Sequence, residues 1–233
     1  MKLEQVLAEV NYEVLQGSLD KEVADIAYDS RKVKKDVMFV AIEGTVVDGH
    51  KFIDSAVAQG AGVVVVEKRV EVADKDVTVV LVKNGREALS LMSAAYFGYP
   101  AKKMITVGIT GTKGKSTTET MVRDIIEKSG KTVGIIGTIG AFMKGKAIVT
   151  ENTTPESYEL QKLFAMMVEN GCEYMVWSFH RRESRWTVSP VLNLITAYLP
   201  TFLPITSDRA STKISQNIFP VRQNCLNIAK SEL

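Results

Sequence analysis

The sequence has little of several residues that mark particular classes of protein. Its 233 residues include only two cysteines, Cys172 and Cys225, and two histidines. The cysteines form no Cys-x-x-Cys pair, which argues against a disulfide scaffold or a zinc site and fits a reducing compartment. No apolar run reaches the roughly 18 residues that a membrane-spanning helix needs, and the amino terminus has no signal-peptide pattern. We therefore expect a cytoplasmic protein without a membrane partner.

The chain also lacks a strong charge of either sign, and glycine is missing from its last part. A formal net charge of +2 indicates no nucleic-acid partner by itself. Residues 1–177 hold 22 Lys and Arg against 24 Asp and Glu, whereas residues 178–233 hold 7 against 3. All 16 glycines lie at or before Gly171, and four of the six prolines lie after it. The length suits one large or two ordinary domains, and the composition changes near residue 177.

The most informative stretch that is present is the loop at residues 108–118, Gly-Ile-Thr-Gly-Thr-Lys-Gly-Lys-Ser-Thr-Thr. A β-branched apolar run precedes it and a helical pattern follows it. In this context glycines let the backbone wrap an anion, and the first N–H groups of the helix point at phosphate oxygens. The spacing departs from Gly-x4-Gly-Lys-[Ser/Thr], because Ile109 stands where the first glycine belongs.

The loop nevertheless predicts a site for nucleotide phosphates. Lys115 would reach the outer phosphates, and the Ser116 hydroxyl would bind Mg²⁺. A glycine turn with Lys-Ser in another context would be only a loop, but behind a strand it favours nucleotide binding. The predicted cofactor-binding residues are Gly111, Thr112, Lys113, Gly114, Lys115, Ser116 and Thr117.

Periodicity predicts an α/β fold with two domains. The first, residues 1–98, begins with a helix over residues 1–17 and continues with short β-branched strands and two helices. Gly98-Tyr99-Pro100 is its predicted boundary, because proline disfavours helix just before it. The expected strands of this domain are residues 23–28, 37–42, 62–67 and 77–82, and its later helices are residues 52–57 and 87–97.

The second predicted domain, residues 99–176, carries the glycine loop. Strands alternate with helices around that loop, which favours an incomplete P-loop-type parallel sheet that binds ATP. A hairpin is expected at residues 140–148 and a helix at residues 157–169. The expected strands are residues 104–109, 132–136 and 174–176.

Several motifs, taken in order, resemble those of the Mur ligase family, and within it the ligases that make UDP-N-acetylmuramoyl-tripeptide. The resemblance extends over residues 20–176 and is specific as a set. One departure is Lys113, where the family usually has asparagine. Besides the glycine loop, the motifs are Asp29-Ser30-Arg31-x-Val33, Phe39-Val40-Ala41-x-x-Gly44, Asp48-Gly49-His50-x-Phe52-Ile53, Ala56-x-x-x-Gly60-Ala61 and Asn152-Thr153-Thr154-Pro155.

The resemblance implies a reaction, its cofactors and its partners. In the family, ATP phosphorylates the free carboxylate of UDP-MurNAc-L-Ala-D-Glu, and the amine of an amino acid displaces phosphate from the acyl phosphate. The implied cofactors are ATP and Mg²⁺, and the implied partners of a monomer are the UDP-MurNAc-dipeptide and an amino acid. A small UDP-sugar-binding domain would precede the ATP-binding domain.

The resemblance also assigns residues to these tasks. Lys115 would be catalytic, since phosphoryl transfer needs charge neutralisation and positioning, and Ser116 would be the metal ligand. Ser30 would hydrogen-bond the nucleotide part of the substrate. The remaining substrate-binding residues would be Asn152, Thr153 and Thr154.

Simpler structural interpretations remain open beside these roles. Asp29-Ser30 alone would more often be a turn or cap. Thr154 and Pro155 are also expected to begin a helix, as its N-cap and its first residue. His50 alone would more often be structural, and we assign it no catalytic role.

The resemblance stops at Trp177. The third central strand of the family runs into Met-Glu-x-Ser-Ser, whose glutamate helps to hold Mg²⁺, but here Tyr174-Met175-Val176 is followed by Trp177-Ser178-Phe179. The family's later motifs, its carbamylated lysine and its carboxy-terminal domain, which selects the amino acid, do not follow either.

The genetic code suggests a cause for this break. Residues 199–205 can be encoded so that another frame reads Thr-Asn-Leu-Ser-Pro-Asp, and residues 205–215 so that it reads His-Ile-Gly-Pro-Gly-Glu-His-Lys-Asp-Phe. Our hypothesis is that residues 177–233 are a poorly ordered, out-of-frame tail and that the chain is a truncated, inactive form. The competing interpretation is a divergent tail. The nucleotide sequence of codons 170–233 decides between them.

Three functions are therefore compared. The first is an ATP-dependent ligase of peptidoglycan precursor synthesis, and the second is a non-catalytic fragment that binds a UDP-sugar and ATP. The third is another ATP-dependent ligase such as folylpolyglutamate synthetase, against which the motifs at residues 29–61 speak. Release of ADP that depends on both UDP-MurNAc-dipeptide and an amino acid would separate them.

Overall fold

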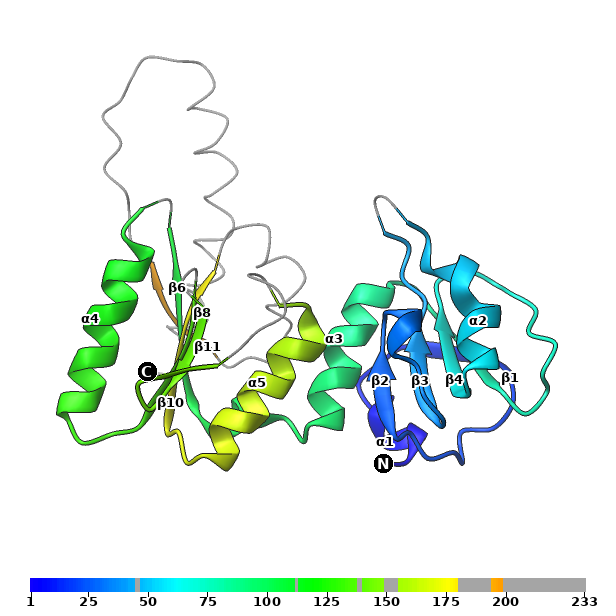
Figure 1. Ribbon diagram of the computed structural model, residues 1–233, viewed down its shortest axis with the longest axis horizontal. Helices are drawn as coiled ribbons and strands as arrows, with labels where there is room; N and C mark the ends of the chain where they lie inside the picture. The colour runs from blue at the N-terminus through cyan, green and yellow to red at the C-terminus, as the bar shows by residue number, and fades with distance from the viewer. Residues whose placement is uncertain (45–46, 112, 138–139, 149–154, 180–193, 199–233) are drawn as a thin grey trace, which may run out of the picture. The chain divides into compact units, whose positions relative to one another are not determined.

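The computed structural model describes residues 1–44, 47–111, 113–137, 140–148, 155–179 and 194–198 (Figure 1). These residues form two compact units. The first holds Met1–Lys103 and residues 155–169, which include helix α5 (Ser157–Glu169), and the second holds the other described residues. Within the described part of the chain, no helix combines the length and apolarity that crossing a membrane requires.

The first unit is built on a five-stranded sheet with the order β1-β5-β4-β3-β2. Strands β2 to β5 are parallel to their neighbours, whereas β1 is antiparallel to β5. The strands are β1 (Tyr12–Gln16), β2 (Asp25–Ala27), β3 (Val37–Val40), β4 (Ala61–Val66) and β5 (Thr78–Val82). The α-helices before α5 are α1 (Leu3–Val6), α2 (Ile53–Ala58) and α3 (Gly85–Tyr96), and the 3-10 helices are η1 (Ser30–Lys32), η2 (Gly49–Phe52) and η3 (Pro100–Lys103).

Both faces of this sheet are buried, which explains its near-continuous apolar strands. On one face Met38 and Val63 pack with Leu89 and Met92 of α3 and with the buried side chains of α1. On the other face Phe39 packs in a cluster with residues of α2. Because successive strand residues point to opposite faces, neighbours in β3 belong to different core clusters.

The prediction of a helix over residues 1–17 is wrong in its second half. Only Leu3–Val6 is α-helical, and Tyr12–Gln16 forms strand β1 against β5. Leu3, Val6 and Leu7 are buried, but Val14, which continues the helical spacing, is exposed. The unpaired edge of β5 offers backbone partners to this segment, so sheet pairing overrides the apparent period. The other elements predicted for this unit form, with small shifts at their ends.

A hydrogen-bonded cluster around His50 joins η2, the end of β4 and the start of α3. The His50 ring is buried, its Nδ1 lies 2.6 Å from Asp48 Oδ1, and its Nε2 accepts a 3.0 Å hydrogen bond from the Glu67 N–H. The Glu67 carboxylate in turn accepts from the N–H groups of Glu43 and Gly85. The structural interpretation of His50 therefore fits its surroundings.

The second unit is built on a six-stranded sheet with the order β11-β6-β10-β7-β8-β9. Its first four strands are parallel, and β8 and β9 form the expected antiparallel hairpin. Helix α4 (Lys115–Lys128) packs on the parallel strands, with Val122 and Ile126 against the cluster of Ile109, Val133 and Val176. The strands are β6 (Ile105–Thr110), β7 (Val133–Gly137), β8 (Gly140–Met143), β9 (Lys146–Ile148), β10 (Tyr174–Phe179) and β11 (Leu194–Tyr198).

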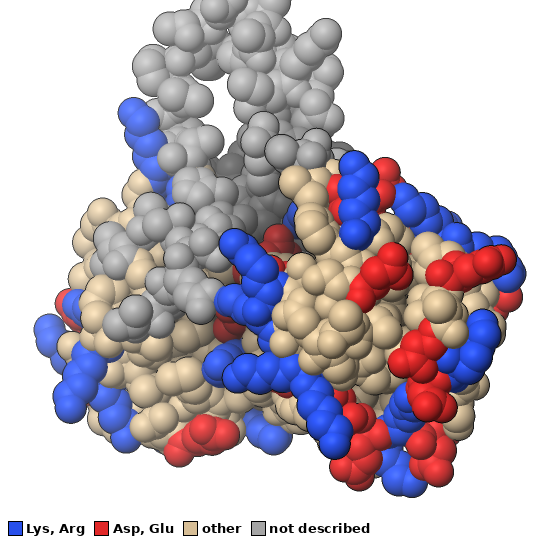
Figure 2. Space-filling model, turned by 45° about the vertical axis from the view of Figure 1, so that its right-hand side comes forward, with Lys and Arg blue, Asp and Glu red and all other residues tan. Residues whose placement is uncertain are grey.

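The α/β fold class predicted from the sequence is confirmed. Within the tail that the sequence predicts to be out of frame, the structure describes two stretches. Trp177–Phe179 completes β10, and Leu194–Tyr198 forms β11 beside β6. The rest of the tail lies outside the described residues. On the face drawn in Figure 2, acidic and basic side chains are interspersed over the first unit.

Candidate nucleotide-binding site

The glycine loop lies between the carboxyl end of β6 and the start of α4, as predicted. Gly114 occupies the N-cap position of α4 with a φ of +78°, in the left-handed region that favours glycine. No side chain of the described residues caps this helix start. Its first N–H groups are therefore open to an anion, and the helix dipole adds partial positive charge there.

Lys115 is the first residue of α4, and its side chain folds back over the loop. The residue is 7% exposed, and its Nζ donates a 2.9 Å hydrogen bond to the Gly111 carbonyl. The ammonium is thereby held on the inner side of the turn, next to the open amides. This arrangement can place a positive charge against a phosphate bound at the helix start.

The other predicted loop residues differ in exposure. Ser116 is half-buried, and its carbonyl accepts a 2.9 Å hydrogen bond from the Thr120 hydroxyl. Lys113 and Thr117 are exposed, and Thr112 lies outside the described residues. The structure thus brings the predicted phosphate and metal residues that it describes onto one loop and one helix turn.

Glu119, one helix turn beyond Lys115, is a residue of this site that the sequence analysis missed. It is 2% exposed, and neither carboxylate oxygen has a hydrogen-bond partner among the described residues. Burial raises the pKa of this carboxyl group, while the nearby Ser178 hydroxyl and the charge of Arg123 act in the opposite direction. An acid with such surroundings marks a candidate functional position.

The predicted substrate residue Ser30 lies in the first unit, at the start of η1. Asp29 is the N-cap of this short helix and accepts from the Arg31 backbone N–H at 3.0 Å. The Arg31 side chain also donates to Asp29, and it holds the pKa of that carboxyl group below its usual value. The capping interpretation of Asp29 is therefore confirmed, and Ser30 follows the cap in a half-buried position.

Asn152, Thr153 and Thr154 lie outside the described residues, but the helix that follows them is well defined. The first hydrogen bond of α5 runs from the Leu160 N–H to the Glu156 carbonyl, so Glu156 takes the N-cap position. The expectation that Pro155 is the first helical residue is wrong by two residues, because the helix begins at Ser157. The reason is that the chain around Glu156 is fixed by tertiary contacts.

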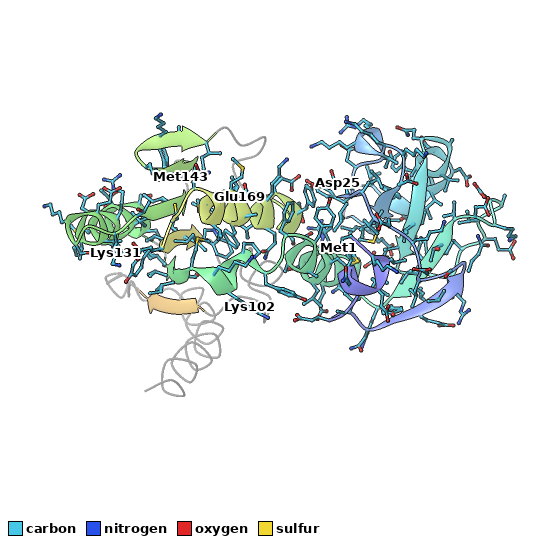
Figure 3. All side chains as sticks on the ribbon, turned by 90° about the horizontal axis from the view of Figure 1, so that it is seen from below. Met1, Asp25, Lys102, Lys131, Met143 and Glu169 are labelled. Carbon is cyan, nitrogen blue, oxygen red and sulfur yellow. The ribbon has the colours of Figure 1, made fainter. Side chains whose placement is uncertain are left out.

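Those contacts attach the start of α5 to β2 and α3 within the first unit. Arg86 of α3 donates a 2.8 Å hydrogen bond to the Glu156 carboxylate. Tyr158 donates a 2.6 Å hydrogen bond to Asp25 Oδ1, and Tyr28 donates a 2.8 Å hydrogen bond to Glu159. Asp25, labelled in Figure 3, is the first residue of β2. Tyr28 is two residues before Ser30, so the start of α5 lies close in space to the turn that carries this predicted substrate residue.

Comparisons with known proteins match two parts of the chain to family models. Residues 22–97 match the "Mur ligase family, catalytic domain", and residues 109–189 match the "Mur ligase middle domain". The chain carries domains of the Mur ligase family. The middle-domain match continues past Trp177, where the resemblance noted from motifs ends.

Curated relatives extend this result. The chain is 43% identical over 178 residues to the UDP-N-acetylmuramoyl-L-alanyl-D-glutamate--2,6-diaminopimelate ligase of Clostridium tetani, a match that covers 76% of this chain and 37% of the relative. Ligase 1 of the same name from Clostridium acetobutylicum is 45% identical over 176 residues, with coverages of 76% and 36%. The chain thus spans less than two fifths of the length of these Mur ligases.

Solved structures support the fold. A structure of a UDP-N-acetylmuramoyl-L-alanyl-D-glutamate--2,6-diaminopimelate ligase superposes with a TM-score of 0.71 at 18% identity, over 88% of this chain and 42% of that one. A UDP-N-acetylmuramoylalanyl-D-glutamyl-2,6-diaminopimelate--D-alanyl-D-alanyl ligase from Acinetobacter baumannii gives a TM-score of 0.54 at 19% identity, with coverages of 84% and 41%. The arrangement of strands around the glycine loop is therefore that of a Mur ligase.

Proposed function

We propose that this Mur ligase chain binds the UDP-linked substrate and ATP for an amino-acid ligase of peptidoglycan precursor synthesis. The observation that carries the proposal is the loop between β6 and α4, with left-handed Gly114, open helix-start amides and the inward Lys115 ammonium. The proposal includes a monomeric, cytoplasmic protein. Its domains would be residues 1–98 for the UDP-substrate, residues 99–176 for ATP, and the tail from 177 to 233.

The reaction needs an activated carboxylate. The substrate UDP-MurNAc-L-Ala-D-Glu would take the γ-phosphoryl group of ATP on its free carboxylate, and the amine of an amino acid would then displace phosphate. Lys115 and the open amides would hold the phosphate oxygens and offset their charge. Ser30, with Asn152, Thr153 and Thr154, would orient the UDP-MurNAc-dipeptide.

Mg²⁺ fits the donors present at this loop. No group of three or more His, Cys, Asp or Glu side chains among the described residues is arranged to hold a metal ion. Mg²⁺ at nucleotide sites is commonly bound by one or two protein oxygens together with phosphates and water, so the Ser116 hydroxyl is a suitable donor. When bound, the ion would neutralise charge on the phosphates.

The names of the relatives make 2,6-diaminopimelate the amino acid to test first. The assay is ADP release by the purified 233-residue chain, with UDP-MurNAc-L-Ala-D-Glu and diaminopimelate each omitted in turn. Release that requires both would support ligase activity. Lys115→Met is the control variant, and a nucleotide hydrolysis that it does not reduce would argue against the site.

A second candidate function is nucleotide and UDP-sugar binding without turnover. Trp177, which is buried in β10, stands where the resemblance expects a glutamate that holds Mg²⁺. Retained binding of the UDP-dipeptide and of an ATP analogue, with no ADP release under any combination of substrates, would favour this candidate. The nucleotide sequence of codons 170–233 tests independently whether the tail is out of frame.

A further inference from the structure

Glu119 is buried without a partner in a place where a carboxylate is costly. Its two oxygens find no hydrogen bond among the described residues, and the residue is 2% exposed. An unpaired charge in such surroundings carries a large desolvation cost unless a cation or donor accompanies it. The Lys115 ammonium one turn away is directed to the Gly111 carbonyl. Among the described residues, no cationic side chain therefore forms a hydrogen bond with this carboxylate.

The backbone is shaped to admit this carboxylate. A Cβ atom added to Gly137, at the carboxyl end of β7, would lie 2.4 Å from both Glu119 oxygens and 2.6 Å from the Ser178 hydroxyl. Ser178, near the carboxyl end of β10, is also buried and without a hydrogen-bond partner among the described residues. Three oxygen atoms thus meet at Gly137, where only a glycine leaves them space.

The direction of the side chain connects this cluster to the phosphate loop. Side chains of an α-helix tilt toward its N-terminus, and residues three or four apart share a face. Glu119 is three residues after Ser116 and four after Lys115, so its carboxylate leans toward the helix turn that carries them. The strand ends at Gly137 and Ser178 belong to the same edge of the parallel sheet as the loop after β6.

We propose that Glu119 is the acidic ligand of the divalent cation that accompanies nucleotide phosphates at this loop. Ser116 supplies a hydroxyl from the same helix face, and Gly137 keeps the space that the carboxylate needs. Hard carboxylate and hydroxyl oxygens suit Mg²⁺, which needs few protein ligands when phosphates supply others. This inference rests on the proposed binding of ATP and adds a specific metal ligand to it.

The test measures the affinity of the full 233-residue chain for a non-hydrolysable ATP analogue by calorimetry, with Mg²⁺ and with a chelator. We expect Mg²⁺ to tighten binding to the parent chain. Glu119→Gln, which keeps the shape and removes the charge, should weaken binding in Mg²⁺ by about 10- to 100-fold. In chelator its affinity should equal that of the parent or exceed it, because a negative charge near the phosphates is gone.

Two further variants separate a ligand from a structural acid. Gly137→Ala keeps the charge but displaces the carboxylate, and it should reduce the Mg²⁺ effect as Glu119→Gln does. Glu127→Gln makes the same chemical change on an exposed position of α4 and should leave the Mg²⁺ effect unchanged. Far-ultraviolet circular dichroism confirms that each variant is folded before it is compared.

The outcomes distinguish this inference from the function on which it rests. An equal Mg²⁺ effect in the parent, Glu119→Gln and Gly137→Ala would overturn the inference and leave nucleotide binding standing. Equal weakening of Glu119→Gln in Mg²⁺ and in chelator would also overturn it, because the loss would not depend on the metal. No binding of the analogue by the parent chain in either condition would overturn the proposed ATP site and the inference together.

Discussion

Replacing His50 should destabilise the first unit, because its buried ring bonds to Asp48 and to the Glu67 N–H. In His50→Leu the side chain keeps a similar volume but loses both ring nitrogens. The Asp48 carboxylate loses its contact with Nδ1 at 2.6 Å, and the Glu67 N–H loses its acceptor, Nε2, at 3.0 Å. Asp48 keeps its bonds from the His50 N–H and from Lys68, so the greater loss is at Glu67.

The magnitude follows from these two bonds. A hydrogen bond to a charged group contributes about 1.5–3 kcal/mol, and a buried donor left without a partner costs about 1–3 kcal/mol. Because Asp48 remains partly solvated, we take the lower part of each range and expect about 3 kcal/mol for His50→Leu. His50→Gln, whose amide oxygen can still accept from Glu67, should cost about half as much.

The assay is urea unfolding followed by far-ultraviolet circular dichroism, which reports on helices and strands directly. Lys51→Gln changes the exposed neighbouring residue and should stay within about 0.5 kcal/mol of the parent. If His50→Leu also stays within that margin, the Glu67 bond contributes nothing measurable. If the free energy of unfolding falls as far in His50→Gln as in His50→Leu, the stabilisation does not come from the acceptor atom of the ring.

Three further predictions concern other contacts. Lys115→Met should weaken binding of an ATP analogue by about 10- to 100-fold in calorimetry, because one charge-assisted contact to phosphate is removed. Unchanged affinity would contradict the role assigned to Lys115. Hydrogen bonds from Lys68 and then from His50 hold the pKa of Asp48 well below its usual value. The stabilisation by this carboxylate is therefore present at neutral pH and is lost as the pH falls below about 4. The free energy of unfolding of Asp48→Asn should vary less with pH in that range than that of the parent, and an unaltered acid profile would refute this. Burial and then Asp25 raise the pKa of Tyr158 above its ordinary value of 10.0, so the free energy of unfolding should fall as pH rises past about 10 in the parent but less in Tyr158→Phe. At neutral pH Tyr158→Phe should lose about 1–2 kcal/mol, the contribution of its bond to Asp25.

Local sequence signals predicted most of the fold, and they failed where a distant partner decided the structure. The strands around the glycine loop and the helix at Ser157–Glu169 carry their own apolar patterns and form as expected. Residues 12–16 also carry a helical pattern, but they pair with β5, which is more than 60 residues away. The start of α5 is likewise set by Tyr28 and Asp25, which the local sequence around Pro155 does not reveal.

The candidate site shows the same limit with one instructive exception. Lys115 and Ser116 were found because a short motif implies their chemistry, whereas no motif includes Glu119. A signal was nevertheless present, because Val122 and Ile126, which pack on the sheet, are three and seven residues after Glu119. A carboxylate at this spacing falls on the buried face of its helix, whereas a solvated carboxylate would lie on the opposite face. The sequence did not reveal the contact with Gly137 at the end of β7. The missing side chain of this glycine makes the space that the Glu119 carboxylate fills. A charge that breaks an apolar helix face directly after a phosphate loop is therefore better interpreted as part of the site than as an interruption of the core.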